Sequence, residues 1–493
     1  MRSTFMGLET ARRGMTVQQY ALETTGNNIA NANTPGYSRQ RVNFEAAEPY
    51  PPLGINRPQV PGQMGTGVKA GSVERVRESF LDVQFRSENN KSGYWSSRAE
   101  ALSRLEDIMN EPSDAGLAKT LDRFWQSLED LAASPNDPGA RSVVRERGIA
   151  VADTFNYLSN SITALQKNTV QEIDVTIKEI NSIATQLNNL NQQIRGIEPH
   201  GYLPNDLYDE RDRLLDRLSE LVDIEVTYEP NRGNALPTAE GNVTVSIVDS
   251  EGNSHTLVDG KDMTTSSLTV DNDNKVKIGA DDLPLNYEKG KLSALLKAHD
   301  DYGKMIDNLD EMAHAFVTEF NEIHKKGWSL SDIKAGSHTE RNFFEELKDV
   351  SGAAKNIKVD QAIIDSRDNI AAATDPNSGE EGNGENALLL AEVKNKVLDK
   401  IGSEEKTTLQ GFYQGVIGEM AVKAQEANRM KSNTETLKIS ADQRRQSISG
   451  ILLDEEIINL IRFQQAYNAS ARMVTVVDQL LEKIINGMGV VGR

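Results

Sequence analysis

The segment DEEIINLIRFQQAYNASARMVTVVDQLLEKIIN, residues 454–486, carries the clearest repeat in the chain. Large apolar residues recur every seven positions, starting one residue before it: Leu453, Leu460, Tyr467, Val474 and Leu481. This repeat predicts a coiled-coil helix, and the acidic residues 454–456 favour its start because they complement the helix dipole. The apolar stripe is too wide for a lone exposed helix. We therefore expect the helix to pack against another one.

The opposite end of the chain has a matching but thinner repeat. Within a helix predicted over residues 4–32, large apolar residues are again spaced by seven: Leu8, Met15, Leu22 and Ile29. The helix should end near Thr34, because Pro35 disfavours helical geometry there and Pro35-Gly36 supplies the centre of a type II turn. Heptads at both ends predict that the terminal segments pair with one another or with neighbouring subunits. Two ordinary core helices of one bundle would fit the pattern equally well.

The middle of the chain is predicted to be mostly helical. Large apolar residues from Phe155 to Ile197 keep a three-or-four spacing almost throughout, and the segment 138–197 is predicted to form one helix of about 60 residues. Further helices are expected at 85–135 with a break at Glu111-Pro112, and at 205–222, 290–326 and 387–448. Short strands are expected at 42–44, 68–76 and 357–359, and an acidic glycine-rich loop at 375–385.

Residues 224–288 change to the alternating pattern of strands, with turn pairs between them. The predicted fold class is therefore mainly α with an inserted β module. Three domains are expected: a terminal coiled-coil domain (1–37 plus 450–493), a helical bundle with some irregular and β segments (38–223 plus 289–449), and the β domain (224–288). An insertion of this kind is expected to be dispensable for folding of the bundle.

Composition excludes several classes of partner. The formal net charge is -20, which argues against a nucleic acid and against an anionic membrane surface. Cysteine is absent, which suits a chain exported unfolded, although chance loss explains it too. No apolar run reaches transmembrane length, and Glu9, Arg12 and Arg13 stand where a signal peptide would be apolar.

No catalytic chemistry is apparent in the sequence. The six histidines lack metal-ligand spacing, and nucleotide-binding and hydrolase motifs are missing. Acidic pairs such as Glu380-Glu381 are expected by chance among 74 acidic residues, and they are typical of solvated faces or helix caps. We expect no catalytic residue, no cofactor and no metal.

Two short motifs carry a family resemblance. Asn28-Ile-Ala-Asn-Ala-Asn-Thr-Pro-Gly-Tyr37 resembles the N-terminal signature of flagellar axial proteins, the family of rod, hook and hook-associated proteins. Residues 463–472, FQQAYNASAR, resemble the paired C-terminal signature. Four features resemble the hook-associated members in particular: residues 34–39 (TPGYSR), 205–216 (NDLYDERDRLLD) and 450–456 (GILLDEE), and the long helix before the β module. Leu452 departs from the pattern, which has a polar residue there.

The resemblance implies a structural component of the junction between hook and filament. It implies that the terminal helices pack as an inner tube lining the export channel, and that the β domain faces outward. The implied partners are further copies in a ring or tubular segment, the hook protein, the next hook-associated protein, and an export chaperone on the C-terminal helix. Export would follow the flagellar type III route to the cell exterior, with termini disordered until assembly. The implied assembly interface comprises Leu8, Met15, Leu22, Ile29, Asn31, Pro35, Gly36, Tyr37, Leu453, Leu460, Tyr467, Val474 and Leu481.

Other classes of protein fit less well. The alternative within the family is another axial protein of the hook or distal rod type, but a hook protein should be β-rich where 138–222 is helical. Flagellin lacks the Asn-Thr-Pro-Gly-Tyr motif, and an enzyme that cuts peptidoglycan needs a catalytic pair. A cytosolic coiled-coil scaffold would leave the Pro-Gly-Tyr turn and the absent cysteine unexplained.

Overall fold

The computed structural model describes residues 5–51, 62–114, 116–271, 275–285, 288–374, 382–401 and 404–487. The chain groups into two compact units. Unit 1 consists of Met1–Ser92, Lys178–Asn286 and Thr434–Arg493, and unit 2 of Gly93–Ile177 and Tyr287–Asn433. This grouping places both terminal segments and the β module in unit 1. The division into three domains remains a prediction.

Helices dominate the described residues. The long ones are α1 (Met6–Ala30), α2 (Ser79–Met109), α3 (Leu117–Ala133), α4 (Pro138–Ile197), α5 (Asn205–Leu221), α6 (Lys291–Lys326), α11 (Leu409–Ser449) and α12 (Leu453–Gly487). Short helices are α7 (Leu330–Ala335), α8 (Ala353–Asn356), α9 (Gln361–Asp365) and α10 (Glu385–Ala391), with 3-10 turns η1 (Glu198–His200), η2 (Arg367–Asn369) and η4 (Glu392–Asn395). None of the described helices combines the length and apolar character needed to cross a membrane.

The strands form small antiparallel sheets. The pairs are β1 (Gln40–Ala46) with β2 (Val68–Arg75), β10 (Trp328–Ser329) with β11 (Ala371–Ala373), and β12 (Leu398–Ile401) with β13 (Glu404–Thr407). The β module has one sheet of β3 (Ile224–Glu229), β4 (Asn242–Val248), β5 (Ser254–Asp259) and β6 (Thr264–Thr265). Its second sheet joins β7 (Leu268–Val270), β8 (Val276–Ile278) and β9 (Asp281–Asp282).

The predicted fold class is confirmed, and several elements agree closely with the sequence. Helix α4 spans the 60 residues of the helix predicted over 138–197. The break at Glu111-Pro112 separates α2 from α3. The Pro35-Gly36 turn is also confirmed, because Gly36 has φ +83° and the Tyr37 amide donates to the Thr34 carbonyl at 3.3 Å.

Two predictions were wrong in part. The helix expected over 387–448 is interrupted by the β12–β13 hairpin, in which Ile401 pairs with Glu404. A Gly-Ser pair separates these two residues, and it is a known signal for a two-residue hairpin turn. The strand expected at 357–359 is only an isolated bridge between Phe344 and Val359. The loop expected at 375–385 falls largely on residues 375–381, outside the described residues.

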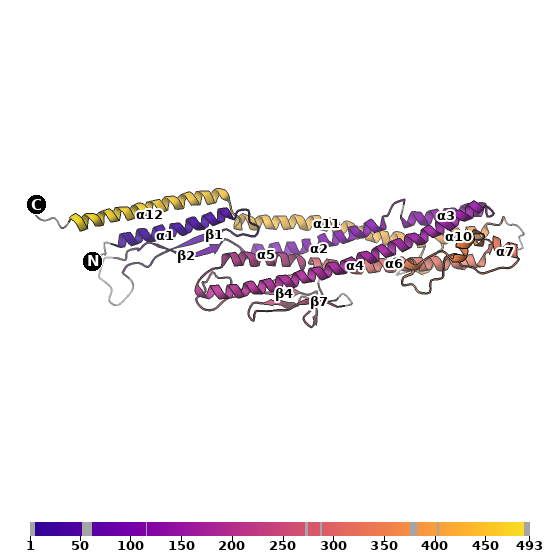
Figure 1. Ribbon diagram of the computed structural model, residues 1–493, viewed down its shortest axis with the longest axis horizontal. Helices are drawn as coiled ribbons and strands as arrows, with labels where there is room; N and C mark the ends of the chain where they lie inside the picture. Colours follow the sequence, from indigo (N-terminus) through magenta and orange to yellow (C-terminus); the bar gives the residue numbers. More distant parts are fainter. Residues whose placement is uncertain are drawn as a thin grey trace. The chain divides into compact units, whose positions relative to one another are not determined.

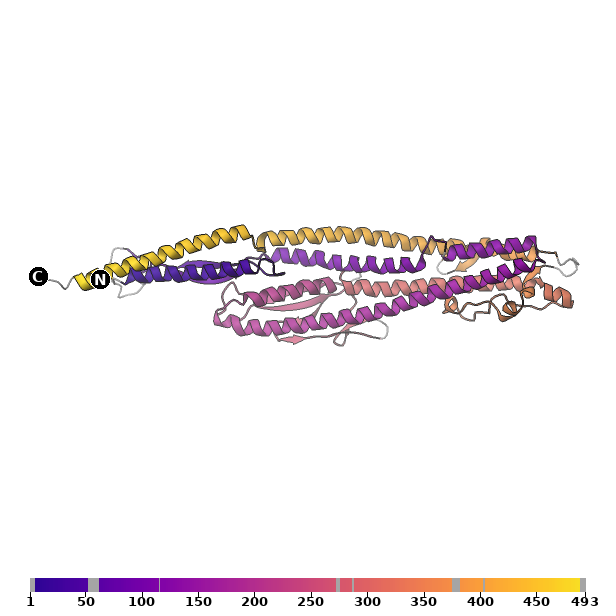
Figure 2. The same ribbon diagram turned by 45° about the horizontal axis from the view of Figure 1, so that its top comes forward.

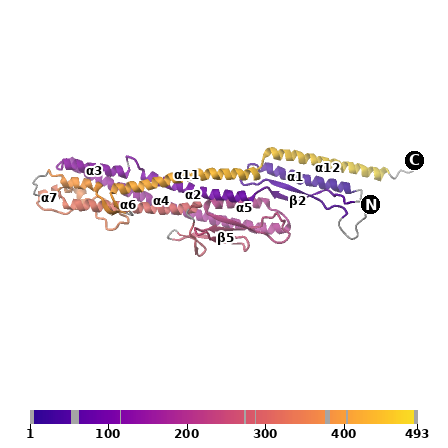
Figure 3. The ribbon, with the colours of Figure 1, turned by 180° about the vertical axis from the view of Figure 1, so that it is seen from behind.

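In unit 1 the two terminal helices lie side by side. Helix α12 runs along α1 in both views of Figures 1 and 2. The β1–β2 hairpin runs along α1 as well, and it is seen from behind in Figure 3. Gln40 is opposite Arg75 in this hairpin. The hairpin therefore starts where the turn after α1 ends.

The β module is fastened to the end of α4 within unit 1. The Asn191 side chain donates to the Val243 carbonyl at 2.8 Å and accepts from the Val243 amide at 2.9 Å. Asn181 makes the same two-way contact with Leu268, at 2.9 and 2.8 Å. Each asparagine thus satisfies the backbone of one sheet as a neighbouring strand would. These contacts run against the expectation that the module is dispensable.

The core of unit 2 is aromatic and aliphatic. Its centre is a group of buried rings whose centroids lie 4.9–6.5 Å apart: Phe124, Trp125, Phe155, Phe316, Phe320, Phe343 and Phe344. The rings come from α3, α4, α6 and the segment after α7. These rings belong to a hydrophobic cluster whose described members all lie in unit 2.

Candidate assembly site at the paired termini

Helices α1 and α12 pair in antiparallel register with a seven-residue period. A Cβ on Gly7 would lie 3.6 Å from the Val477 side chain, and one on Gly14 would lie 3.1 Å from Ser470 Oγ. Moving seven residues up α1 therefore moves the contact seven residues down α12. The contact at Gly14 is tighter than an ordinary Cβ contact, so glycine at this position lets the two helices approach closely.

Asn28 continues this period and joins three elements. Its Nδ2 donates to the Gln40 carbonyl at 2.8 Å and to Glu456 Oε2 at 3.1 Å. Its Oδ1 accepts from the Gln40 amide at 3.0 Å and from the Tyr37 hydroxyl at 3.1 Å. Both donors and both acceptor positions of this buried amide are used. Asn28 thus fixes α1, the turn after it and the start of α12 relative to one another.

The turn after α1, residues 31–37 of the N-terminal signature, is held by its own side chains; we call it the signature turn. Asn31 Nδ2 donates to the Asn27 carbonyl at 3.0 Å, and the Thr34 hydroxyl donates to Asn31 Oδ1 at 3.1 Å. Burial, and then the charges of nearby carboxylates, raise the pKa of Tyr37 to about 12. Its phenol therefore keeps the proton that it donates to Asn28.

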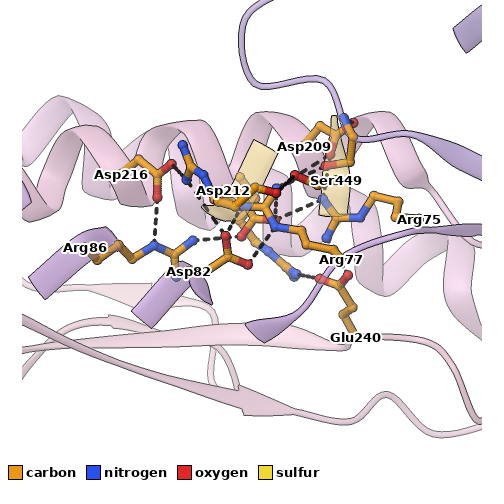
Figure 4. Close-up of polar contacts among 12 residues, drawn as sticks. Arg75, Arg77, Asp82, Arg86, Asp209, Asp212, Asp216, Glu240 and Ser449 are labelled. Atoms are coloured by element: carbon orange, nitrogen blue, oxygen red, sulfur yellow. Dashed lines mark hydrogen bonds and ion pairs between the residues drawn. The ribbon is translucent and has the colours of Figure 1, made fainter. Parts of the chain in front are cut away.

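Beyond the turn, α5 presents three carboxylates on one face. Asp209, Asp212 and Asp216 are spaced by three and four, which places them together. The arginines that meet them come from β2, the segment after it, α2 and the end of α11: Arg75, Arg77, Arg86 and Arg445. Figure 4 shows Arg75, Arg77 and Arg86 converging on the three carboxylates. We call the three carboxylates and the four arginines the charge cluster.

Asp212 lies at the centre of the charge cluster. Its carboxylate is 2.9 Å from Arg75 Nη1, 3.0 Å from Arg86 Nη2 and 3.3 Å from Arg77 Nη1. Burial alone would raise the pKa of Asp212, but Arg77, Arg75 and Arg86 hold it well below its usual range. The residue is therefore ionised, and three arginines depend on its charge.

The charge cluster is connected to the signature turn. The Ser38 amide donates to Asp209 Oδ2 at 3.0 Å, and Arg77 donates to the Ser38 hydroxyl at 3.1 Å. Burial raises the pKa of Asp209, although Arg75 at 2.7 Å and the Ser38 amide oppose the rise. The cluster therefore anchors the chain immediately after the turn to α5.

A residue of the β module also enters the cluster. Glu240 contacts both Arg75 and Arg211, and the guanidinium groups of these arginines lie 5.1 and 5.0 Å from the centre of the Tyr208 ring. Every carboxylate of the cluster faces an arginine, so none is free to act as a base. No group of side chains suited to hold a metal occurs among the described residues. The ion pairs of the cluster connect β2, α2, α5 and the end of α11.

The predicted interface residues fall into two groups. Half-buried are Leu8, Met15, Leu22, Ile29, Asn31, Tyr37, Leu460, Tyr467, Val474 and Leu481, whereas Pro35, Gly36 and Leu453 are exposed. The structure buries another face of α1 instead, formed by Val17, Ala21, Thr25 and Asn28. Sequence reasoning missed this face, although Gly7, Gly14, Ala21 and Asn28 form a heptad of small or polar residues.

Three family profiles match the chain. Residues 102–344 match the flagellar hook-associated protein FlgK helical domain, and residues 8–37 match the flagella basal body rod protein. Residues 442–487 match the flagellar basal body rod FlgEFG protein C-terminal region. The N-terminal match covers nearly all of α1 and the turn after it, and the C-terminal match covers the last turns of α11 and all of α12.

Individual relatives agree with these profiles. Flagellar hook-associated protein 1 of Bacillus subtilis is 46% identical over 517 aligned residues, which cover 100% of both chains. The protein of the same name from Salmonella typhimurium is 25% identical over 97% of this chain and 98% of its own. The solved structure of the flagellar hook junction protein FlgK from Burkholderia pseudomallei is similar in fold, with a TM-score of 0.59 at 15% identity. It covers 74% of this chain and 100% of that one.

The hook or distal rod alternative is not favoured. The hook protein FlgE of Borreliella burgdorferi matches only 19% of this chain. The present chain carries at both ends the signatures shared by axial proteins, and its full length aligns with hook-associated protein 1 of Bacillus subtilis. The chain therefore belongs to the flagellar hook-associated protein 1 family.

Proposed function

We propose that this chain is a structural, non-enzymatic component of the junction between flagellar hook and filament, assembled through its terminal helices. One observation carries the proposal: α12 leaves nine large apolar side chains exposed in a single copy. They are Leu453, Ile457, Ile458, Ile461, Met473, Val476, Leu480, Ile484 and Ile485. Covering half of each would contribute on the order of 10 kcal/mol per copy before the entropy cost of assembly.

The other side of α12 is already occupied by α1. Val477 and Ser470 face the glycines of α1, and Leu460, Tyr467, Val474 and Leu481 are half-buried. The exposed residues are thus left for helices of other copies. A tube built from such pairs would use the α1–α12 pair as its repeating unit.

The remaining partners are part of the same proposal. We place the hook protein and the next hook-associated protein at the two ends of the assembled segment. An export chaperone would cover the apolar face of α12 before assembly. Export to the cell exterior is supported by the absence of cysteine, which suits a chain that crosses an export channel unfolded.

The free chain keeps its termini mobile until assembly. Among the described residues of α12, Glu456 alone is buried, so the pair is held by little enclosed surface. Limited proteolysis of the purified chain should remove about 40 residues from each end. Full protection of both termini in the monomer would contradict this.

Location tests the proposed function directly. A peptide tag inserted at the exposed Glu251-Gly252 turn would be labelled with gold-conjugated antibody and viewed by electron microscopy. Label confined to the boundary between hook and filament is expected, and cells that lack the chain should keep hooks but shed filaments. Label along the whole hook or along the filament would overturn the proposal.

A further inference from the structure

A hollow of about 460 Å³ lies beside the terminal helix pair. Its walls are the last turns of α1, residues 39–44 at the start of β1, and the first turns of α12. Phe44 and Phe463 meet edge to face at its rim, with ring centroids 6.0 Å apart. All three walls belong to unit 1, so the hollow is a feature of one compact body.

The hollow contains arginines without carboxylate partners. Arg39 Nη1 is paired with Glu455 at 2.9 Å. Arg41 has no ion pair or side-chain hydrogen bond within the described ranges. Arg462 donates only to the neutral Asn459 side chain at 3.0 Å and lies over the Phe463 ring. Two guanidinium groups are thus available to a carboxylate, the group that they bind best because their donors match its two oxygens.

Further along α12 there are two carboxylates that lack a cationic partner, as the two arginines lack an anionic one. Asp478 and Glu482 are exposed and four residues apart, which places them on one face. Neither has an ion-pair partner in the described part of the chain. The terminal segments therefore carry two unpaired cations near the start of α12 and two unpaired anions near its end, within the described residues.

The two pairs cannot meet within one copy. Arg462 and Asp478 are 16 residues apart on the same helix, a separation of about 24 Å along its axis. At about 100° per residue they also lie about 160° apart around the axis. They therefore occupy opposite flanks of α12.

Complementary patches on opposite flanks suit a head-to-tail contact, in which each copy presents a different surface to each neighbour and repetition gives a ring or a tube. We infer that Asp478 and Glu482 of one copy enter the arginine-lined hollow of the next, with neighbours offset along the helix axis. This inference rests on the proposed function, because it names the partner surface used in that assembly. It predicts the contact between copies and no new activity.

Charge reversal tests the contact in cells that lack the native chain. The first variant combines Arg41→Glu with Arg462→Glu, the second combines Asp478→Lys with Glu482→Lys, and the third carries all four changes. Each double reversal should lower filament retention at least roughly tenfold, because like charges would face each other. The fourfold variant should return to within about twofold of the native level. Arg472→Glu, an exposed cation of α12 outside the hollow, should have no effect.

A cross-link gives a readout independent of motility. Since the chain has no cysteine and positions 462 and 478 lie about 24 Å apart on one helix, a chain that carries Arg462→Cys and Asp478→Cys can form disulfides only between copies, and peptide mapping identifies the 462–478 link. A ladder of linked chains from isolated flagella is expected, and monomers alone would overturn the inference. So would failure of the fourfold variant to recover, or an equal loss in Arg472→Glu.

A failure of the contact through the hollow can be distinguished from a failure of the proposed function. Leu460→Asp disturbs the α1–α12 pair and should block assembly whether or not the hollow is used. Normal filaments in Leu460→Asp would contradict the proposed function itself. Loss of filaments in Leu460→Asp with full retention in both double reversals would overturn only the contact through the hollow.

Discussion

Asn28 and Glu456, 428 positions apart in the chain, share a buried hydrogen bond of 3.1 Å. The same asparagine holds both backbone groups of Gln40, so it connects the end of the first helix, the start of the hairpin and the start of the last helix. Shape alone does not set the alignment of α1 and α12, because their contact repeats every seven residues. The polar contact at Asn28 distinguishes the observed register from one shifted by a heptad.

Asn28→Ala should therefore weaken the terminal pair. It leaves the Gln40 amide and carbonyl without a side-chain partner and the Tyr37 hydroxyl without its acceptor, at a cost of about 1–3 kcal/mol for each group that stays buried. We expect filaments to be shed under shear at lower force than in the native strain, measured as the fraction of filamented cells after graded shearing. Asn33→Ala, at an exposed position of the same motif, is the control and should behave as the native chain.

Leu460→Asp or Val474→Asp should block incorporation into the flagellum without unfolding the isolated chain. In the assembled helices an unpaired carboxylate would cost several kcal/mol in every copy, whereas in a mobile terminus it stays in water. The measurements are the melting temperature of each purified variant and filament retention in cells. Leu460→Met, which keeps an apolar side chain of similar volume at the same position, is the control and should assemble normally. A large drop in the melting temperature of the Leu460 or Val474 variants would mean that α12 is an ordinary core helix.

Asp212→Asn should destabilise unit 1 by about 3–5 kcal/mol, because three buried arginines would lose their shared carboxylate. Hydrogen exchange of α5 and β2, followed by mass spectrometry, measures this locally. The matched control is Glu220→Gln, which removes a surface partner of Arg217 on the same helix and should change stability by less than about 1 kcal/mol. Unchanged protection of α5 in Asp212→Asn would show that the cluster is unimportant for unit 1.

Unit 2 should lose stability in mild acid through His324. Its Nδ1 donates to the Arg341 carbonyl at 2.8 Å and its Nε2 accepts from the Ala371 amide at 3.0 Å, so only the neutral ring fits. Burial lowers the pKa of His324 from 6.5 to about 4. The unfolded chain therefore binds this proton more readily, and stability falls between pH 6.5 and pH 4 by about 3 kcal/mol in total.

Tryptophan fluorescence measures this change selectively, because Trp95, Trp125 and Trp328 all belong to unit 2. The free energy of unfolding in denaturant should be flat above pH 6.5 and fall below it. His324→Gln, which does not titrate in this range, should show a smaller fall between pH 6.5 and pH 4. Equal slopes for the two chains would exclude His324 as the cause.

Replacing 226–288 by a short Gly/Ser linker should destabilise unit 1, contrary to what an inserted module suggests. The deletion leaves Asn191 and Asn181 without their backbone partners and removes Glu240 from Arg211. We expect faster hydrogen exchange in α5 and in the last turns of α4. A variant that only shortens the exposed turn at 250–252 is the control, and unchanged exchange in the deletion would restore the original expectation.

The sequence predicted the helices well because their signal is local. The repeat of α4 continues almost throughout the helix, and the heptads of α1 and α12 predicted that the terminal segments pair with one another or with neighbouring subunits. The charge cluster could not be predicted in the same way. Asp209, Asp212 and Asp216 look like a solvated helix face, and only folding brings Arg75 and Arg86 to them from more than 120 positions away. Asn28 stands in the N-terminal signature, but its contact with the last helix could not be predicted, because an asparagine near a helix end is usually explained as a capping residue.

The distance along the chain between Asn28 and Glu456 has a consequence for quality control. A ribosome that stops before residue 456 yields a product with a complete first helix, hairpin and charge-bearing α5, yet its first helix has nothing to align with. Such a fragment can fold locally but cannot close its ends. The α1–α12 pair can therefore form only in a chain whose translation has passed residue 456. A chain truncated before this residue lacks the pair and fails at the step of assembly with intact copies.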